Sequence, residues 1–446
     1  MSTGFAVNPP DPGVVASFAP SPQRNAPRET FTRFLAEAPT TQEQAGISST
    51  LIEDLFLRHV YLKRCNTISA LSESMALAYP IVEKVFREVR GQRLLEVSGM
   101  VGDDYVFSLT SAGRATAGER CHVCQYAGPA PVSLRAYQKS VLDQRPQVAV
   151  NRASLRLAFG DLVVTDRLLD QLGPALAAQN SIFLYGPAGT GKSSLAERLL
   201  RVYEDQLVIP YAIEVDNQII VLFDPAVHER VEFDMDGYDP RWMVCHRPCV
   251  IVGGELVPSM LELRLDDTSG TYAPPVQMKA NGGILVIDDF GRQLISPRDL
   301  LNRWIVPLDR RIDYLSLNYG VRFHIPFEVM IVFATNLEPS ELADEAFLRR
   351  IPNKILVDAV APQVFDEIFR RVALKLNMPY EEGTSEYLRT LCIARGGDLR
   401  PSYPRDMCQI IRAIKAYEEE PPRINRPDLE RAVELYFGTM EGGHSG

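Results

Sequence analysis

The sequence predicts an α/β fold: a parallel sheet carrying a phosphate-binding loop, with a helical domain after it and a smaller α+β domain before it. Three observations support this prediction. An apolar, strand-length run and a helical pattern enclose a glycine-rich loop within 181–200. A second apolar run, 284–287, ends in two acidic residues. From 362 onward the apolar residues recur at helical spacing.

The overall charge argues against binding to nucleic acid or anionic membrane through the whole surface. The 446 residues include 47 basic and 57 acidic side chains, which gives a net charge of −10. Such a chain has no global positive field, so any contact with DNA would need a local basic patch. The length suits two or three domains, each with a substantial core.

We expect a cytoplasmic protein without a membrane segment. Apolar runs such as 329–334 are far shorter than the roughly 18 residues of a membrane helix, and the N-terminus lacks the pattern of a secretion signal. Seven cysteines, an odd number spread along the chain, indicate reduced thiols. A zinc site formed by Cys121, Cys124, Cys245 and Cys249 is left open as an alternative.

The first 46 residues are rich in proline among small and polar residues, so we expect a disordered tail. A short docking element around Phe31, Phe34 and Leu35 is the alternative. Residues 47–125 predict three helices and then two short strands around a Gly/Asp turn. The helices begin at Leu51 and span 67–77 and 80–90, and the strands are 94–97 and 105–109.

Three helices followed by a hairpin resemble a winged-helix domain, and Leu109–Arg114 is similar to the end of the wing in bacterial winged-helix regulators. This resemblance raises DNA binding through Lys84, Arg87 and Arg90. Residues 51–120, however, hold nine basic and nine acidic side chains. Balanced charge does not favour binding by counterion release, so we favour an unknown protein partner and keep DNA as the alternative.

Residues 126–154 predict a linker and a bridging helix, and a nucleotide-binding core is expected at 155–361. Within that core, 202–280 is an unusually long insertion between two motifs. We expect it to contain a hairpin that turns at Asp216–Asn217. The strands of that hairpin are 209–215 and 218–223.

The glycine-rich loop fits the pattern GxxxxGK[ST] at each fixed position. Its glycines allow backbone N–H groups to point inward, and the following helix adds its dipole, so the loop forms an anion site. Lys192 is expected to reach the β- and γ-phosphates, and Ser193 to offer its hydroxyl to Mg²⁺. The predicted nucleotide-binding residues are Gly186, Pro187, Ala188, Gly189, Thr190, Gly191, Lys192, Ser193 and Ser194.

Two later strands are expected to deliver polar side chains to the same edge of the sheet. Asp288 and Asp289 follow the run 284–287, and Asn336 follows the run 329–334. We expect Asp288 to hold Mg²⁺, commonly through water, and Asp289 to orient or deprotonate the attacking water. The amide of Asn336 can hydrogen-bond the γ-phosphate or that water.

These motifs, followed by Asp344–Arg350, resemble in their order the AAA+ ATPases, whose pattern is Walker A, Walker B, sensor 1 and an arginine finger. The resemblance covers roughly 155 to the end of the chain. It implies that Asn336 is sensor 1. It also implies that Arg349 and Arg350 reach the nucleotide of the next subunit in a ring homo-oligomer, for which the family expectation is a hexamer.

The same resemblance implies that the helices within 362–446 form a lid over the nucleotide. Arg405 is then expected to be the sensor 2 arginine that touches the γ-phosphate, with Arg400 as the alternative. This chain departs from most of the family in carrying Asp288-Asp289 in place of Asp-Glu, although Asp-Asp occurs in helicase-loader and transposition-helper members. The shorter acid is expected to slow hydrolysis.

The function expected from these features is hydrolysis of ATP, with Mg²⁺, coupled to remodelling of a protein partner that the winged-helix domain recognises. Two alternatives are kept: a DNA-binding regulator or loader that ATP switches, and an assembly protein that binds ATP without turning it over.

Overall fold

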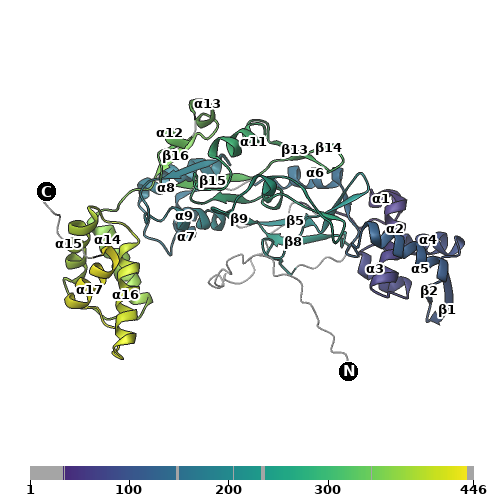
Figure 1. The fold of residues 1–446 in the computed structure, drawn as a ribbon, viewed down its shortest axis with the longest axis horizontal. Helices are drawn as coiled ribbons and strands as arrows, with labels where there is room; N and C mark the ends of the chain where they lie inside the picture. The colour runs from purple at the N-terminus through teal and green to yellow at the C-terminus, as the bar shows by residue number, and fades with distance from the viewer. Residues whose placement is uncertain are drawn as a thin grey trace, which may run out of the picture.

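The computed structural model describes residues 34, 36–146, 150–203, 205–232, 237–342 and 344–438 (Figure 1). The central part holds a parallel sheet, and two small domains lie at its ends: a helical domain from the C-terminal end of the chain, and a domain of helices and one hairpin from the N-terminal end. No helix in these described ranges is long and apolar enough to cross a membrane.

The core of the nucleotide-binding part is a five-stranded sheet in the order β16-β4-β15-β12-β9, in which every neighbouring pair is parallel. Its strands are β4 (Ile182–Tyr185), β9 (Cys249–Val252), β12 (Ile284–Ile287), β15 (Met330–Thr335) and β16 (Asn353–Leu356). The predicted α/β fold class with a parallel sheet is therefore confirmed.

Both faces of this sheet are buried, which explains why its strands are continuous apolar runs. Alternate residues point to opposite faces: Ile284 and Val286 join one apolar cluster, and Leu285 and Ile287 join another. The first cluster includes residues of α7 (Arg152–Ala158), α8 (Asp166–Ala177) and α9 (Lys192–Leu199), and the second includes residues of α11 (Pro297–Arg310). Because the strands are parallel, their carboxyl ends meet at one edge.

The insertion differs from its predicted bounds, because β9 lies inside 202–280 and is the edge strand of the core sheet beside β12. The expected hairpin is present as β6 (Ala212–Val215) and β7 (Gln218–Val221). Asp216 and Asn217 both have positive φ, as a tight two-residue turn requires. Residues 206–210 pair with another strand and are not part of this hairpin.

A second, mixed sheet is formed largely by the insertion and has the order β10-β11-β7-β6-β3. Two antiparallel ribbons, β5 with β8 and β13 with β14, complete this half of the molecule. The other strands and helices between residues 126 and 361 are β3 (Val132–Ser133), β5 (Gln206–Pro210), β8 (Trp242–His246), β10 (Arg264–Asp266), β11 (Thr271–Ala273), β13 (Ile312–Ser316), β14 (Arg322–Pro326), α6 (Leu134–Asp143), α10 (Val276–Lys279), α12 (Pro339–Leu342) and α13 (Glu345–Leu348). The two short 3₁₀ helices are η1 (Leu200–Val202) and η2 (Pro258–Leu261).

The N-terminal domain contains the predicted order of three helices and a hairpin, with one short helix before them and one helix after them. Its elements are α1 (Gln42–Ala45), α2 (Ser49–Leu62), α3 (Ile68–Met75), α4 (Tyr79–Gly91), β1 (Leu95–Val101), β2 (Asp104–Leu109) and α5 (Ser111–Val123). The turn lies at Gly102–Asp103, and both strands extend closer to it than expected. The predicted wing end, Leu109–Arg114, instead opens α5, because the Thr110 hydroxyl accepts from Gly113 N–H as an N-cap.

The predicted disordered tail lies outside the described residues over 1–33 and at 35, but the prediction is wrong for 36–46. Glu37 forms a β-bridge with Tyr238, and α1 follows with a capping box at Thr41. The ring of Phe34 also lies 5.2 Å from that of Trp242, edge to face. The start of this segment therefore packs against the insertion despite its polar composition.

The N-terminal domain shares its apolar core with the insertion. Ala212 and Ile219, from the β6–β7 hairpin, belong to the same buried cluster as the residues of α2 to α5. A buried ion pair reinforces this joint: the Arg241 guanidinium pairs with Asp239 at 2.8 Å and donates to the carbonyls of Ala45 and Pro131. Segments far apart in the sequence are therefore held in one body.

The C-terminal helical domain consists of four helices around their own core. They are α14 (Pro362–Lys375), α15 (Thr384–Gly396), α16 (Tyr403–Tyr417) and α17 (Arg426–Phe437). Proline occupies the first turn of α14, α16 and α17, where the missing N–H and fixed φ favour a helix start.

Candidate nucleotide-binding site

The phosphate-binding loop connects β4 to α9, and its glycines meet specific steric demands. Gly186 has φ +135°, and a Cβ there would lie 2.3 Å from the Val357 carbonyl oxygen. Gly189, with φ +79°, would bring a Cβ to 2.6 Å from Ser402 Oγ. Only glycine fits both the conformation and the space at these two positions.

Lys192, the first residue of α9, is buried, and its ammonium lies at the mouth of the loop. Nζ donates to the carbonyl oxygens of Gly186 and Pro187, both at 2.8 Å, and to Asn336 Oδ1 at 2.7 Å. Burial lowers the pKa of Lys192, and the nearby carboxylates Asp288 and Asp289 oppose that shift. The structure therefore brings Lys192 and Asn336 together.

The remaining predicted loop residues occupy the same turn. Pro187 and Ala188 offer their carbonyls to neighbours, and the Thr190 hydroxyl donates to Pro187 O at 3.0 Å. Gly191, at φ +92°, is the N-cap of α9. Ser194 lies in the first turn of α9, where its carbonyl accepts from Arg198.

Ser193 and Asp288 meet across the site. Ser193 Oγ donates to Asp288 Oδ1 at 3.0 Å, which joins the first turn of α9 to the carboxyl end of β12. A hydroxyl and a carboxylate are oxygen ligands of the kind Mg²⁺ prefers, so the donor set fits this ion. Among the described residues no group of three or more His, Cys, Asp or Glu side chains is placed to hold a metal, and this holds for the four cysteines considered above.

Asp289 follows Asp288 in the left-handed region, at φ +47°, which is uncommon for a residue with a side chain. Its exposed carboxylate lies 3.4 Å from the amide nitrogen of Asn336. Asn336 thus contacts both Lys192 and Asp289. The ends of β4, β12 and β15 place these side chains on one edge of the sheet.

The C-terminal helical domain reaches the loop through the segment before α16. Arg400 donates to Ala188 O, and Ser402 N–H donates to Gly189 O, both at 3.1 Å. Arg405, the residue predicted for this role, lies exposed in the first turn of α16. Of the two arginines, the structure brings Arg400 to the loop, because Arg400 precedes the helix where the chain crosses residues 188–189.

Arg349 and Arg350 lie at the end of α13. Arg349 is exposed, whereas Arg350 forms an ion pair with Asp309 of α11, with distances of 2.8 and 2.9 Å from Nε to the two carboxylate oxygens. Their role in a neighbouring subunit remains a prediction.

Two groups at the site are not found from the sequence. Ser402 and the Gln293 side chain touch the backbone of the phosphate loop and of the acidic turn, respectively. Neither residue belongs to a recognisable motif. Their role depends on contacts between segments, which sequence spacing does not show.

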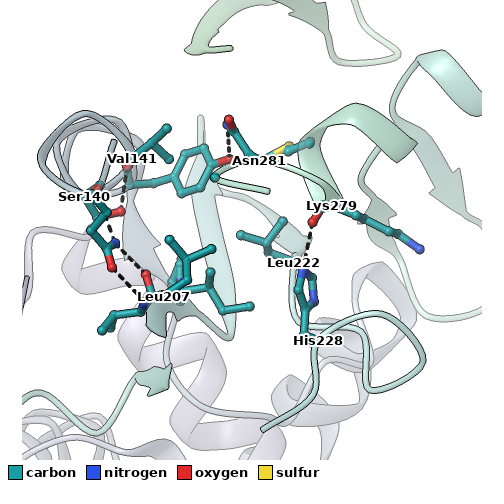
Figure 2. Close-up of a pocket in the computed structure, with 14 residues that line it drawn as sticks. Ser140, Val141, Leu207, Leu222, His228, Lys279 and Asn281 are labelled. Atoms are coloured by element: carbon teal, nitrogen blue, oxygen red, sulfur yellow. Dashed lines mark hydrogen bonds between the residues drawn. The ribbon is translucent and has the colours of Figure 1, made fainter. Parts of the chain in front are cut away.

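A separate small cavity lies between the insertion and α6 (Figure 2). Leu207, Leu222 and His228 point into it, and the polar side chains around it form hydrogen bonds with neighbouring residues. His228 Nδ1 accepts from Asp224 N–H at 3.0 Å, and Nε2 faces the Lys279 carbonyl at 2.9 Å. We therefore regard this cavity as part of the structural core.

The C-terminal helical domain is the part of the chain that matches a known family. Residues 361–435 match a family described as a domain of unknown function (DUF8689). No curated protein matches the sequence.

Several solved structures are similar at low scores. The RuvB Holliday junction branch migration motor of Thermotoga maritima has a TM-score of 0.35 and 15% identity, covering 66% of this chain and 72% of that chain. NtrX of Brucella abortus has a TM-score of 0.39 and 16% identity, covering 62% and 56%. Its complex with ATP has a TM-score of 0.37 and 14% identity, covering 68% and 61%. Similarities at these scores assign no activity to this chain.

Proposed function

We propose that this protein is a Mg²⁺-dependent ATPase of the AAA+ type. The observation that carries this proposal is the convergence of four side chains at the carboxyl edge of the sheet: Lys192, Ser193, Asp288 and Asn336 are joined by hydrogen bonds of 2.7 and 3.0 Å. A phosphate loop alone fits many nucleotide-binding proteins. An acidic strand end and a polar amide beside it fit hydrolysis.

Each residue has a role in this proposal. Lys192 and the loop N–H groups bind the phosphates, while Ser193 and Asp288 would hold Mg²⁺, which supplies charge neutralisation at the phosphates. Asp289 accepts the proton of the attacking water or orients it, and Asn336 orients that water or the γ-phosphate. Arg400, from the C-terminal helical domain, contributes a positive charge beside the loop.

We further propose that hydrolysis needs a neighbouring subunit, which donates Arg349. Mixing variants tests this. Asp289→Asn and Arg349→Ala subunits should each be inactive alone. In an equal mixture about a quarter of the interfaces combine an intact Asp289 with an intact Arg349, so activity should partly return. Mixtures that stay inactive while wild-type subunits turn over ATP would exclude an arginine supplied in trans.

The work that hydrolysis drives is proposed to be remodelling of a protein partner, which the N-terminal domain recognises. Affinity capture with Asp289→Asn protein saturated with ATP should retain that partner. The matched comparison is Lys192→Ala protein, which should not retain it. Equal capture by the two variants would argue against a partner whose binding depends on ATP.

A second candidate, binding of duplex DNA, is favoured by one observation: Lys84, Arg87 and Arg90 are all exposed along α4. Glu83, however, pairs with Arg87 at 2.7 Å and neutralises part of this face. Duplex affinity that falls steeply with salt, and is lost when the three residues are replaced by Gln, would support this candidate. Absence of duplex binding at low salt would remove it.

A further inference from the structure

The turn that carries Asp289 is held by a side chain outside the known motifs. Gln293 Oε1 accepts from Gly291 N–H at 2.8 Å, and Gln293 Nε2 donates to the carbonyls of Asp288 at 2.8 Å and Asp289 at 3.1 Å. A backbone N–H can meet only the amide oxygen, and carbonyls can meet only the amide nitrogen. These three bonds therefore also fix the orientation of the Gln293 amide.

The backbone held in this way is strained. Asp289 has φ +47°, in the left-handed region, which residues with a side chain adopt far less often than glycine does. Such a conformation persists only where surrounding contacts determine it, and it is concentrated at functional sites. At Asp289 the carbonyl accepts from Gln293 and from Arg292 N–H, while the N–H donates to Asp288 Oδ1.

The φ angle of Asp289 sets the direction in which its carboxylate leaves the chain. In the observed conformation the carboxylate faces Asn336, whose other amide atom contacts Lys192. A return of Asp289 to an extended conformation would turn the carboxylate away from that pair. A change in φ is a rotation about the N–Cα bond of Asp289. The Gln293 amide opposes this rotation because it binds the carbonyl before that bond, of Asp288, and the carbonyl after it, of Asp289.

We propose that Gln293 is a positioning residue for the carboxylate of Asp289. This inference rests on the proposed ATPase function and extends it beyond the motif residues. Gln293 itself is half-buried and contacts only backbone atoms in these three bonds, so its effect on the reaction is exerted through Asp289. Loss of Gln293 should therefore lower turnover without weakening nucleotide binding.

The chain offers a matched control in Gln144. Its Nε2 donates to the carbonyls of Ser140 and Val208 at 3.1 and 2.8 Å, and its Oε1 accepts from Val208 N–H at 2.7 Å. This buried glutamine makes the same three kinds of bond as Gln293, but between α6 and β5. Replacing it removes an equal set of backbone contacts from a structural region.

The experiment compares Gln293→Met and Gln144→Met in the full chain, by steady-state ATP hydrolysis, affinity for a fluorescent ATP analogue and thermal unfolding. For Gln293→Met we expect kcat to fall ~10- to 100-fold, as for a group that displaces a reacting partner by about 1 Å, with the affinity for the analogue within about twofold. Gln144→Met should lower the unfolding temperature and leave kcat unchanged.

A second variant keeps the inference testable if Gln293→Met folds poorly. Gln293→Glu retains an acceptor for Gly291 N–H but loses both donors to the carbonyls, so it should also lose turnover. Wild-type kcat in either folded Gln293 variant would overturn the inference, as would an equal loss of kcat in Gln144→Met. A wild-type chain that binds Mg·ATP without turnover would instead overturn the proposed function, before any variant is compared.

Discussion

At the scale of single residues, the ammonium of Lys192 is the charge on which the site depends. It is buried, and its three acceptors are two loop carbonyls and the Asn336 amide. A triphosphate would replace neutral acceptors by charged ones, and hydrogen bonds between charged groups are about twice as strong as neutral ones. The lysine is therefore expected to contribute to affinity more than any single loop N–H.

Lys192→Ala should weaken binding of ATP at least ~100-fold, because it removes charge-assisted hydrogen bonds of about 1.5–3 kcal/mol each. Titration with a fluorescent ATP analogue measures this. Lys354→Ala is the control, since Lys354 Nζ also donates to two carbonyls, those of Leu348 and Ile351, but lies exposed on β16. Equal affinity losses in the two variants would contradict the assignment of Lys192.

At the scale of elements, sequence periodicity predicts most of the helices and three of the five core strands, β4, β12 and β15, because local spacing and proline positions determine them. The four C-terminal helices lie within 362–446, where apolar residues at helical spacing predict helices. The strand β9 is not predicted, because Cys249–Val252 is a run of four residues inside an apparent insertion. Its place in the sheet depends on pairing with β12, which is a contact between distant segments.

In the site, too, local sequence patterns predict some residues, whereas others depend on contacts between distant segments. Motifs are sufficient to predict that four side chains lie close together, since each is directly at a strand end or a helix start: Lys192, Ser193, Asp288 and Asn336. The choice between Arg400 and Arg405 cannot be made in that way. It depends on where the C-terminal helical domain lies against the loop, and the loop contact at 3.1 Å belongs to Arg400.

We expect Arg400→Ala to lower kcat for ATP ~10- to 100-fold, because it removes a cation beside the loop. Arg405→Ala is the comparison, since Arg405 lies exposed in the first turn of α16. Steady-state hydrolysis at saturating ATP measures both variants, and the larger loss should belong to Arg400. A larger loss in Arg405→Ala would restore the prediction made from the sequence.

Within α2, His59 couples the N-terminal domain to pH. Its Nε2–H must donate to the Gly128 carbonyl at 2.9 Å, so its Nδ1 accepts from the Ser74 hydroxyl at 2.9 Å. Burial lowers the pKa of His59 to about 4. The ring is therefore neutral in the folded protein at neutral pH.

The unfolded chain binds a proton at His59 below about pH 6.5, whereas the folded chain does so only below about pH 4. The contribution of His59 to the free energy of unfolding should be fully present above pH 6.5 and should fall by about 3 kcal/mol as the pH drops toward 4. Amide hydrogen exchange in α2 of the full chain measures this. His59→Gln should flatten that pH dependence, and an unchanged dependence would show that another group is responsible.

At the scale of the whole molecule, the joint at Arg241 should be the sensitive point. Arg241→Met would leave the buried carboxylate of Asp239 without its ion pair, which costs about 3–5 kcal/mol. Urea unfolding of the full chain should show an early transition, together with faster proteolysis near Ala45. The double variant Asp239→Asn/Arg241→Met should recover part of the loss, and a double variant no better than the single would contradict this.

The shared core of the N-terminal domain and the insertion has a practical consequence for anyone who dissects this protein. A fragment ending near residue 125 looks self-contained on paper, yet it would lack Ala212 and Ile219, which fill its interior from another part of the chain. Such a fragment would expose an apolar surface and would be prone to aggregation during purification. Partner screens are therefore better run with the intact chain as bait.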